Sequence, residues 1–155
     1  MSTRTRGNEQ ILVTIPGQPV AQGRPRITTI GGRPRAFDPA KSRSWKGAAQ
    51  VHMQAAMVAA GLKPLDGPLR VSIVAIFSCP RSSYRKREPR SRRWNYGRPD
   101  AENIAKAVLD AGNGTLYNDD AQVVELVVSK LIGAQGEPAR VEVAVEAAAA
   151  VEVLS

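Results

Sequence analysis

The sequence has very little cysteine and histidine. Among its 155 residues there is one cysteine, Cys79, and one histidine, His52. A single cysteine excludes an internal disulfide framework and leaves too few ligands for a cysteine zinc site. We expect Cys79, which ends an apolar run, to fill space in the core. We expect His52, alone within a predicted helix, to be a surface or packing residue and not a catalyst.

Long apolar runs are also missing. No run approaches the roughly 18 to 20 apolar residues that a membrane span requires, and the start MSTRTRGNEQ is too polar for a secretory signal. We therefore expect a soluble protein of the cytoplasm, associated with the nucleoid and without a membrane partner. The length suits a single domain over residues 1–155, with residues 1–9 as a flexible arm because they hold little apolar surface.

Positive charge is abundant and clustered. The formal net charge is +8 and the pI is near 10.3. The most basic stretch, residues 81–98, carries eight cations against Glu88: Arg81, Arg85, Lys86, Arg87, Arg90, Arg92, Arg93 and Arg98. Such clustering favours a polyanionic partner, because basic side chains release the counterions condensed on nucleic acid. A solvated basic surface kept for solubility is the alternative.

Periodicity and turn residues predict a mixture of strands and two main helices. Asp38 and Pro39 are typical of a helix N-cap and first turn, and Gly61 of a helix end. Residues 81–98 lack an apolar period, so we expect an exposed loop there that could be disordered. The expected strands are Ile11–Ile15, Leu69–Phe77, Val123–Leu131 and Arg140–Glu146, and the expected helices run from Asp38 to Ala60 and from Asp100 to Gly112.

Three connections have recognisable patterns. Gly31 and Gly32 signal a turn between two short extended segments. Residues 133–138 are predicted to join the last two strands as a hairpin-like loop. The tail, residues 147–155, is expected to be a short C-terminal helix or a packed end.

Acidic residues follow the basic stretch almost directly. Six of the 14 acidic residues lie between Asp100 and Glu125. At 100° per residue, Glu102, Lys106 and Asp110 share one side of the predicted helix with Asn103. A turn at residues 113–114 could then bring Asp119 and Asp120 back beside this helix. Three or four convergent carboxylates suffice to hold Mg²⁺, so the segment predicts a metal-dependent nuclease.

Each of these features also has an ordinary structural interpretation. Glu102 and Lys106 are spaced for a salt bridge on a solvated helix face, as are Lys106 and Asp110. Asp100 is a common N-cap residue, and residues 118–120 have the composition of a turn. The proximity of the basic stretch is what favours the functional interpretation.

Three motifs follow one another along the chain. The first is Ile15-Pro16-Gly17-Gln18-Pro19 with Arg24-Pro25-Arg26. The second is Arg98-Pro99-Asp100-Ala101-Glu102-Asn103 with Lys106 and Asp110-Ala111. The third is Tyr117-Asn118-Asp119-Asp120-Ala121-Gln122. In this order they resemble the RusA family of Holliday junction resolvases, and the resemblance spans roughly residues 11 to 146.

This resemblance implies an α+β fold, with a single domain in which a mixed β-sheet packs with two main helices. It further implies a homodimer that binds four-way DNA junctions and cuts paired strands with Mg²⁺, Mn²⁺ being a possible substitute. By motif position, Asp100, Glu102 and Asp120 would be catalytic and metal-binding, Asp119 a further metal ligand, and Lys106 the essential lysine. Glu102 stands where the family usually has Asp, although Glu remains a legitimate oxygen ligand.

DNA contacts are expected from basic residues that precede and follow the first helix in the sequence. The residues are Arg24, Arg26, Arg33, Arg35, Arg85, Lys86, Arg87, Arg90, Arg92, Arg93 and Arg98. Tyr84, Trp94 and Tyr96 could stack on unpaired bases or pack at the loop base. Three rival functions stay open: a broader flap or fork nuclease, a junction-binding protein with impaired catalysis, and a basic assembly protein that binds acidic partners.

Overall fold

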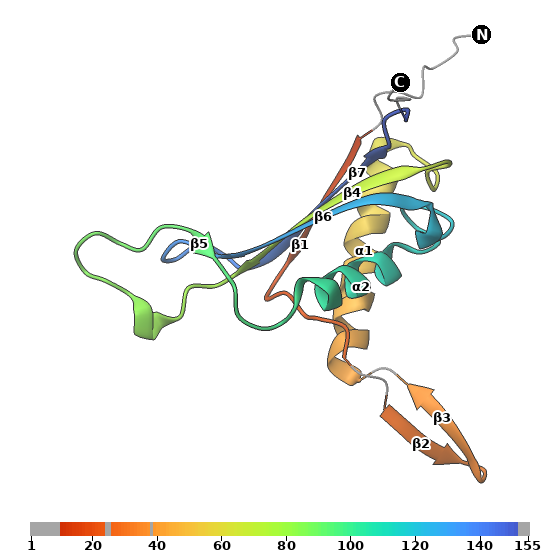
Figure 1. Cartoon of the computed structure of the whole chain (residues 1–155), viewed down its shortest axis with the longest axis horizontal. Helices are drawn as coiled ribbons and strands as arrows, with labels where there is room; N and C mark the ends of the chain where they lie inside the picture. The colour runs from red at the N-terminus through yellow and green to blue at the C-terminus, as the bar shows by residue number, and fades with distance from the viewer. Residues whose placement is uncertain (1–9, 24–25, 38, 152–155) are drawn as a thin grey trace.

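The computed structural model describes residues 10–23, 26–37 and 39–151, and its main feature is a five-stranded sheet with both helices on one face (Figure 1). The strand order is β1 (Gln10–Pro16), β7 (Arg140–Ala147), β4 (Leu69–Phe77), β6 (Val123–Ile132) and β5 (Arg93–Trp94). β4 and β6 run parallel, whereas the other neighbours are antiparallel. The predicted α+β class with a mixed sheet and two helices is confirmed.

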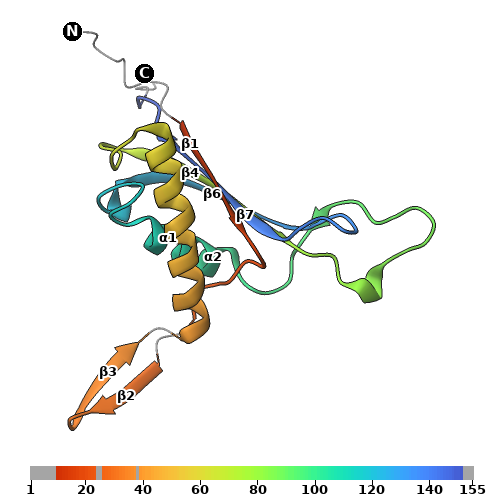
Figure 2. The ribbon, with the colours of Figure 1, turned by 180° about the vertical axis from the view of Figure 1, so that it is seen from behind.

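The core lies between this sheet and the helices α1 (Ala40–Ala60) and α2 (Ala101–Gly112). Alternate residues of β1, β7 and β4 are buried in this core, as the period of two in their sequences requires. α1 buries Trp45, Ala49, Met53 and Met57, which recur every four residues or so along one face. Figure 2 shows α1 in front of the sheet. Cys79 is buried, as expected, and His52 is exposed.

The start of α1 differs from the prediction by a small shift. Pro39 occupies the N-cap position and the helix begins at Ala40, while Asp38, the predicted cap, lies outside the described residues. The end is as predicted, because Gly61 adopts a left-handed φ of 66° and its N–H bonds to the last carbonyls of the helix.

The predicted hairpin between the last two strands is wrong. Residues 133–139 do connect β6 to β7, but β4 lies between the two strands, which therefore do not pair. A turn pattern after an apolar strand cannot reveal which neighbour the next strand will choose. The consequence is that β6 reaches toward the edge of the sheet, with only the two residues of β5 beyond it.

Two segments extend from the body of the fold. The antiparallel pair β2 (Arg26–Ile30) and β3 (Arg33–Phe37), with Gly31 and Gly32 at its turn, projects beyond the start of α1 (Figures 1 and 2). Residues 81–98 form the second, a long loop that leaves the far end of β4. It contains a 3₁₀ turn at Arg81–Ser83 and β5, and hydrogen bonds to the β6–β7 connection fix its shape. The expectation that it could be disordered is wrong.

The chain ends leave little to describe. Residues 148–151 form no helix, and residues 1–9 and 152–155, for which an arm and part of a tail were predicted, lie outside the described residues. Neither helix in the described part of the chain combines the length and apolar character needed to cross a bilayer.

Two helical glycines offer a matched test of the packing. A Cβ on Gly112 would lie 2.6 Å from the Tyr117 hydroxyl oxygen, whereas a Cβ on Gly47 would meet nothing within 4 Å. We expect Gly112→Ala to lower the free energy of unfolding by about 1–3 kcal/mol through overpacking. Gly47→Ala should raise it by up to about 1 kcal/mol through helix propensity. Urea denaturation measures both, and equal effects would contradict the close packing of Tyr117 on α2.

Candidate active site

A cavity of about 540 Å³ opens at the N-terminal end of α2. Asp100 occupies the N-cap position, and its carboxylate accepts no capping hydrogen bond from the described residues. Its oxygens are therefore available to a ligand in the cavity. Gln22 N–H donates to the Asn103 carbonyl at 2.9 Å and brings the first motif against this helix. The cavity is lined by Pro19, Val20, Ala21, Lys41, Phe77, Arg98, Pro99, Asp100 and Asn103.

Lys130, which the sequence analysis missed, anchors the segment that precedes Asp100. Its Nζ donates to the Gly97 carbonyl at 2.5 Å and to the Pro99 carbonyl at 2.7 Å. Lys130 lies near the end of β6 and is partly buried, so the segment is tied to the sheet directly beside the candidate site. Lys130 could have been identified from the sequence, because it is the one lysine in an otherwise mostly apolar strand.

Glu102 and Lys106 form the salt bridge that their spacing suggested. The Lys106 Nζ lies 3.8 Å from Glu102 Oε1, and their side chains are 60% and 81% exposed. A pair as exposed as this one contributes little to stability, about 0.3–0.5 kcal/mol for a helix pair. Both side chains can therefore turn toward a ligand at small cost.

A second group of carboxylates lies at the other end of α2. The Asp120 N–H donates to Asn113 Oδ1 at 2.9 Å, and Asp119 caps a 3₁₀ turn by accepting from the Ala121 N–H. The pKa of Asp120 is raised, mainly by partial burial and then by the neighbouring Asp119 and Asp110. A nearby cation would favour the ionised form of such a carboxyl group and lower its pKa again.

Gln122 and Tyr117 of the third motif hold this acidic loop in place. Gln122 Oε1 accepts from the N–H groups of Asn118 and Asp119, while its Nε2 donates to the carbonyls of Leu65 and Gly67. Tyr117 is buried and its hydroxyl donates to the Leu109 carbonyl at 2.6 Å. Burial above all, and then the charge of Asp120, raises the pKa of Tyr117. The aromatic ring and the amide thus position the aspartates without reacting.

The two groups of carboxylates are well separated within one chain. α2 has 12 residues, which at 1.5 Å per residue puts its ends about 18 Å apart. The predicted return of Asp119 and Asp120 beside the helix does occur, but at the end near Asp110, away from Asp100 and Glu102. Accordingly, the described residues contain no group of three His, Cys, Asp or Glu arranged around one metal position. The expectation that a helix and a turn alone would gather these acids is not met.

The predicted DNA-binding side chains differ in their surroundings. Lys86, Arg87 and Arg33 are exposed, whereas Arg92 is bound by Glu137, which also pairs with Arg140 at 3.2 Å. The pKa of Glu137 is lowered to about 2, mainly by the hydrogen bond from Arg92. The side chains of Arg24, Arg26 and Arg35 lie outside the described residues. The DNA contacts themselves stay predictions.

All three aromatic side chains near the basic stretch are exposed: Tyr84 by 45%, Trp94 by 69% and Tyr96 by 99%. The hydroxyl of Tyr84 also accepts from the Gly136 N–H at 3.1 Å, so this residue has a structural role at the loop base.

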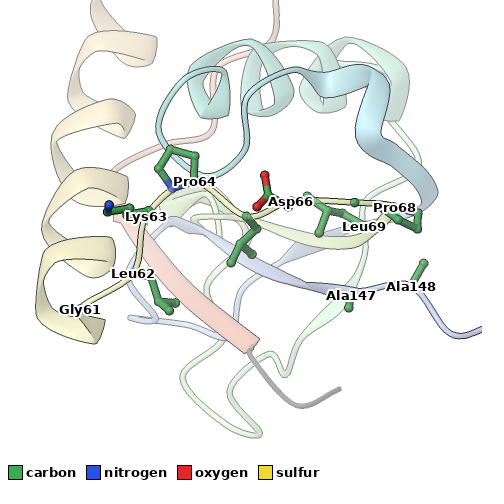
Figure 3. A pocket seen from close by; sticks show the side chains of 11 residues that line it. Gly61, Leu62, Lys63, Pro64, Asp66, Pro68, Leu69, Ala147 and Ala148 are labelled. Carbon is green, nitrogen blue, oxygen red and sulfur yellow. The ribbon is translucent and has the colours of Figure 1, made fainter. Parts of the chain in front are cut away.

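Another cavity, of about 390 Å³, lies apart from these residues. It is formed by residues 61–69 and the end of β7 at Ala147 and Ala148 (Figure 3). Its walls are mostly apolar, with Lys63 and Asp66 as the charged residues. None of the predicted site residues contributes to it.

Asp100 and Glu102 at one end of α2, Asp119 and Asp120 at the other, and an arginine-rich loop are features that suit a protein acting on a phosphate polymer. The family model of endodeoxyribonuclease RusA matches residues 16–146. A Bacillus subtilis (strain 168) protein described as uncharacterized protein YqaN is 37% identical over 141 residues, which cover 86% of this chain and 93% of that protein.

The chain belongs to the RusA endodeoxyribonuclease family, and the resemblance inferred from the three motifs is confirmed. Membership implies a hydrolase that cleaves DNA internally. Nucleases of this family generally depend on a divalent metal ion.

The pKa of Asp120 leads to a stability test. Because its pKa is raised above the ordinary 3.8, the folded state holds the proton more tightly than the unfolded state. This contribution to stability is complete at low pH and is lost as the pH rises through the raised pKa. In EDTA, Asp120→Asn should match the wild type near pH 3 and exceed it in free energy of unfolding near pH 7. A less stable variant near pH 7 in urea denaturation would contradict the crowding of carboxylates.

The contacts of Lys130 lead to a test of activity. We expect Lys130→Met to slow single-turnover cleavage of branched DNA by about 10- to 100-fold, because small displacements of a reacting group have effects of this size. Lys130→Arg retains donors at this position and should recover part of the rate. The control is Lys63→Met, an exposed lysine of the separate cavity. Full activity of a folded Lys130→Met would refute the positioning role.

Proposed function

We propose that the protein is a Mg²⁺-dependent endonuclease that resolves four-way DNA junctions by paired phosphodiester hydrolysis in recombination and repair. Family membership supports the nuclease activity, and the net charge of +8 supports a nucleic-acid substrate. The two-fold symmetry of a junction suits a symmetric dimer that cuts opposed strands. The cytoplasmic, nucleoid-associated location predicted from the sequence belongs to the same proposal.

The available donor set fits a hard divalent cation. Asp100, Glu102, Asp119 and Asp120 offer carboxylate oxygens, the ligands that Mg²⁺ and Mn²⁺ prefer. Asp100 makes no capping hydrogen bond, and partial burial, followed by the neighbouring Asp119 and Asp110, raises the pKa of Asp120. A bound cation would offset both effects. When bound, the ion would supply an activated water and stabilise charge on the leaving oxygen.

The basic residues near Asp100 would handle the DNA strand. Lys41 and Arg98 line the same cavity as Asp100, so they can bind the phosphates that flank the scissile bond. Lys106 is exposed on α2 one turn beyond Glu102, where it can offset negative charge that develops on the phosphate. These roles need no large movement of the backbone.

An uncovered strip on β6 supports a homodimer. Leu126 pairs in register with core residue Val71 and therefore points to the helix side of the sheet, yet it is 43% exposed. Val124, at the register shift between β4 and β6, is 60% exposed. The edge of β6 over residues 123–129 has no strand partner among the described residues. α2 contacts β6, so a second copy placed here would bring its own α2 close to the first.

The carboxylates at opposite ends of α2 carry the proposal for the site. In a symmetric dimer with the two copies of α2 antiparallel, Asp100 and Glu102 of one chain would face Asp119 and Asp120 of its partner. Each dimer would then hold two composite metal sites, one for each strand to be cut. The acids that one chain keeps about 18 Å apart would meet across the two-fold axis.

Mixing two inactive variants tests this arrangement. Asp100→Asn and Asp120→Asn homodimers should each lose cleavage about 100-fold or more, because several kcal/mol of charge stabilisation are removed. Both should still bind junctions, since losing an acid does not weaken phosphate contacts. A mixed dimer keeps one intact composite site, so co-refolded variants should regain nicking of a labelled junction in Mg²⁺, with cuts in one strand at a time.

Failure to regain nicking, with mixed dimers verified by differential tags, would contradict sites shared between two chains. A linear duplex and a flap measured beside the junction separate the remaining alternatives. Equal cleavage of flap and junction would indicate the broader flap or fork nuclease. Tight junction binding without cleavage by the wild type would indicate that Glu102, in place of the usual Asp, has impaired catalysis. No preference for branched DNA would leave the basic assembly protein.

A further inference from the structure

The basic arm, defined here as residues 81–93, keeps its shape without a core of its own. It projects from the end of the sheet, and none of residues 81–93 is buried (Figures 1 and 2). It carries seven of the chain's 22 basic residues: Arg81, Arg85, Lys86, Arg87, Arg90, Arg92 and Arg93. Like charges at this density repel, so specific polar contacts must hold the arm together.

Gln135, on the β6–β7 connection, provides four of those contacts, beside the Arg92–Glu137 pair and the Tyr84 hydroxyl described above. Its Oε1 accepts from the Arg85 N–H at 2.8 Å and from the Arg90 N–H at 2.7 Å. Its Nε2 donates to the Arg85 carbonyl at 3.1 Å, and its own N–H donates to the Arg90 carbonyl at 3.0 Å. One residue, about 50 positions away in the sequence, thereby closes residues 85–90 into a loop.

The closed loop contains a residue in an unfavourable conformation. Glu88 has a φ of 50°, in the left-handed region that non-glycine residues rarely adopt. Such a conformation persists where the surroundings fix the backbone, which is what the bonds of Gln135 to both sides of Glu88 do.

A cavity of about 280 Å³ lies within the loop, lined by Arg85, Glu88, Pro89, Arg90, Ser91 and Arg93. Three arginines line this one opening together with the acidic Glu88, and guanidinium groups offer the planar donors that phosphate groups bind best. The guanidinium nitrogens of Arg93 lie 3.9 Å from the Cys79 sulfur. Arg90 is itself oriented, because its Nε donates to the Ser83 carbonyl at 2.8 Å.

We propose that Gln135 is a positioning residue that holds the basic arm as a preformed cradle for a DNA backbone phosphate. Arg85, Arg90 and Arg93 bind the phosphate, and Gln135 acts through the backbone of the arm without touching DNA. A preformed cradle avoids the entropy loss of ordering a charged loop at each encounter. The inference rests on the proposed function in one respect, that the bound polymer is branched DNA.

Limited proteolysis tests the clamp without DNA. In Gln135→Ala, trypsin should cut at Lys86 and Arg87 about tenfold faster or more than in the wild type, because local opening no longer breaks the hydrogen bonds of Gln135. Gln54→Ala, at an exposed position of α1, is the matched control and should leave the rate unchanged. An unchanged cleavage rate in Gln135→Ala would overturn the clamp.

Junction binding and cleavage test the cradle. Gln135→Ala should weaken junction binding about tenfold and reduce the salt dependence of log K by about one phosphate contact. The single-turnover cleavage rate at saturating protein should not change, which separates a role in binding from a general loss of structure. Adding Arg85→Ala to Gln135→Ala should weaken binding by less than the product of the single effects, because both act through one cradle.

The outcomes are distinguishable from those of the proposed function. Faster proteolysis with unchanged junction affinity would overturn the cradle, as would fully multiplicative effects of the two substitutions. If the wild type fails to bind branched DNA, the proposed function fails and the phosphate role with it. Proteolysis still decides in that case whether Gln135 orders the arm.

Discussion

The burial of one face of α2 against the sheet is the constraint on which the rest of the structure depends. Ile104, Ala105, Ala107 and Val108 are buried, which fixes both the rotation and the position of the helix. The opposite face then carries Glu102 and Lys106. Asp100 lies at the N-terminal end of the helix, and Asp119 and Asp120 lie next to its C-terminal end. A rigid helix sets the distance between the two acidic groups within one chain, about 18 Å.

Polar side chains outside the candidate site hold the backbone beside both acidic groups. Lys130 ties the backbone before Asp100 to β6, and Gln122 ties the loop of Asp119 and Asp120 to residues 65–67. In each case a polar side chain binds backbone carbonyls, which are strong acceptors that must find partners when water is excluded.

Local patterns predicted the elements of the fold well. The strand alternation at β4 and β7, the amphipathic face of α2 and the glycine that ends α1 all follow from neighbours a few residues apart, and all are confirmed. Sequence motifs also identified the family, because their order along the chain can be recognised without knowing which residues are in contact. The exposure of Glu102 and its pairing with Lys106 followed from helical spacing alone.

Long-range contacts explain what the sequence could not predict. The insertion of β7 beside β4 depends on hydrogen bonds between distant strands, so the turn at residues 133–138 was misinterpreted as a hairpin. The order of the basic arm depends on Gln135, whose role no local pattern reveals. The separation of Asp100 from Asp120 depends on which end of α2 the acidic loop meets, and that follows from Asn113 and Tyr117.

The free edge of β6 has a consequence for the isolated chain. Residues 123–129, VVELVVS, present unpaired backbone groups and have Glu125 as their one charged residue. Natural proteins usually protect such an edge with several charges, a proline or a bulge, because otherwise it recruits foreign strands into aggregates. Over residues 123–129 the protection consists of Glu125 and the register shift beside it. A chain whose β6 edge stays uncovered should therefore aggregate more readily as its concentration rises.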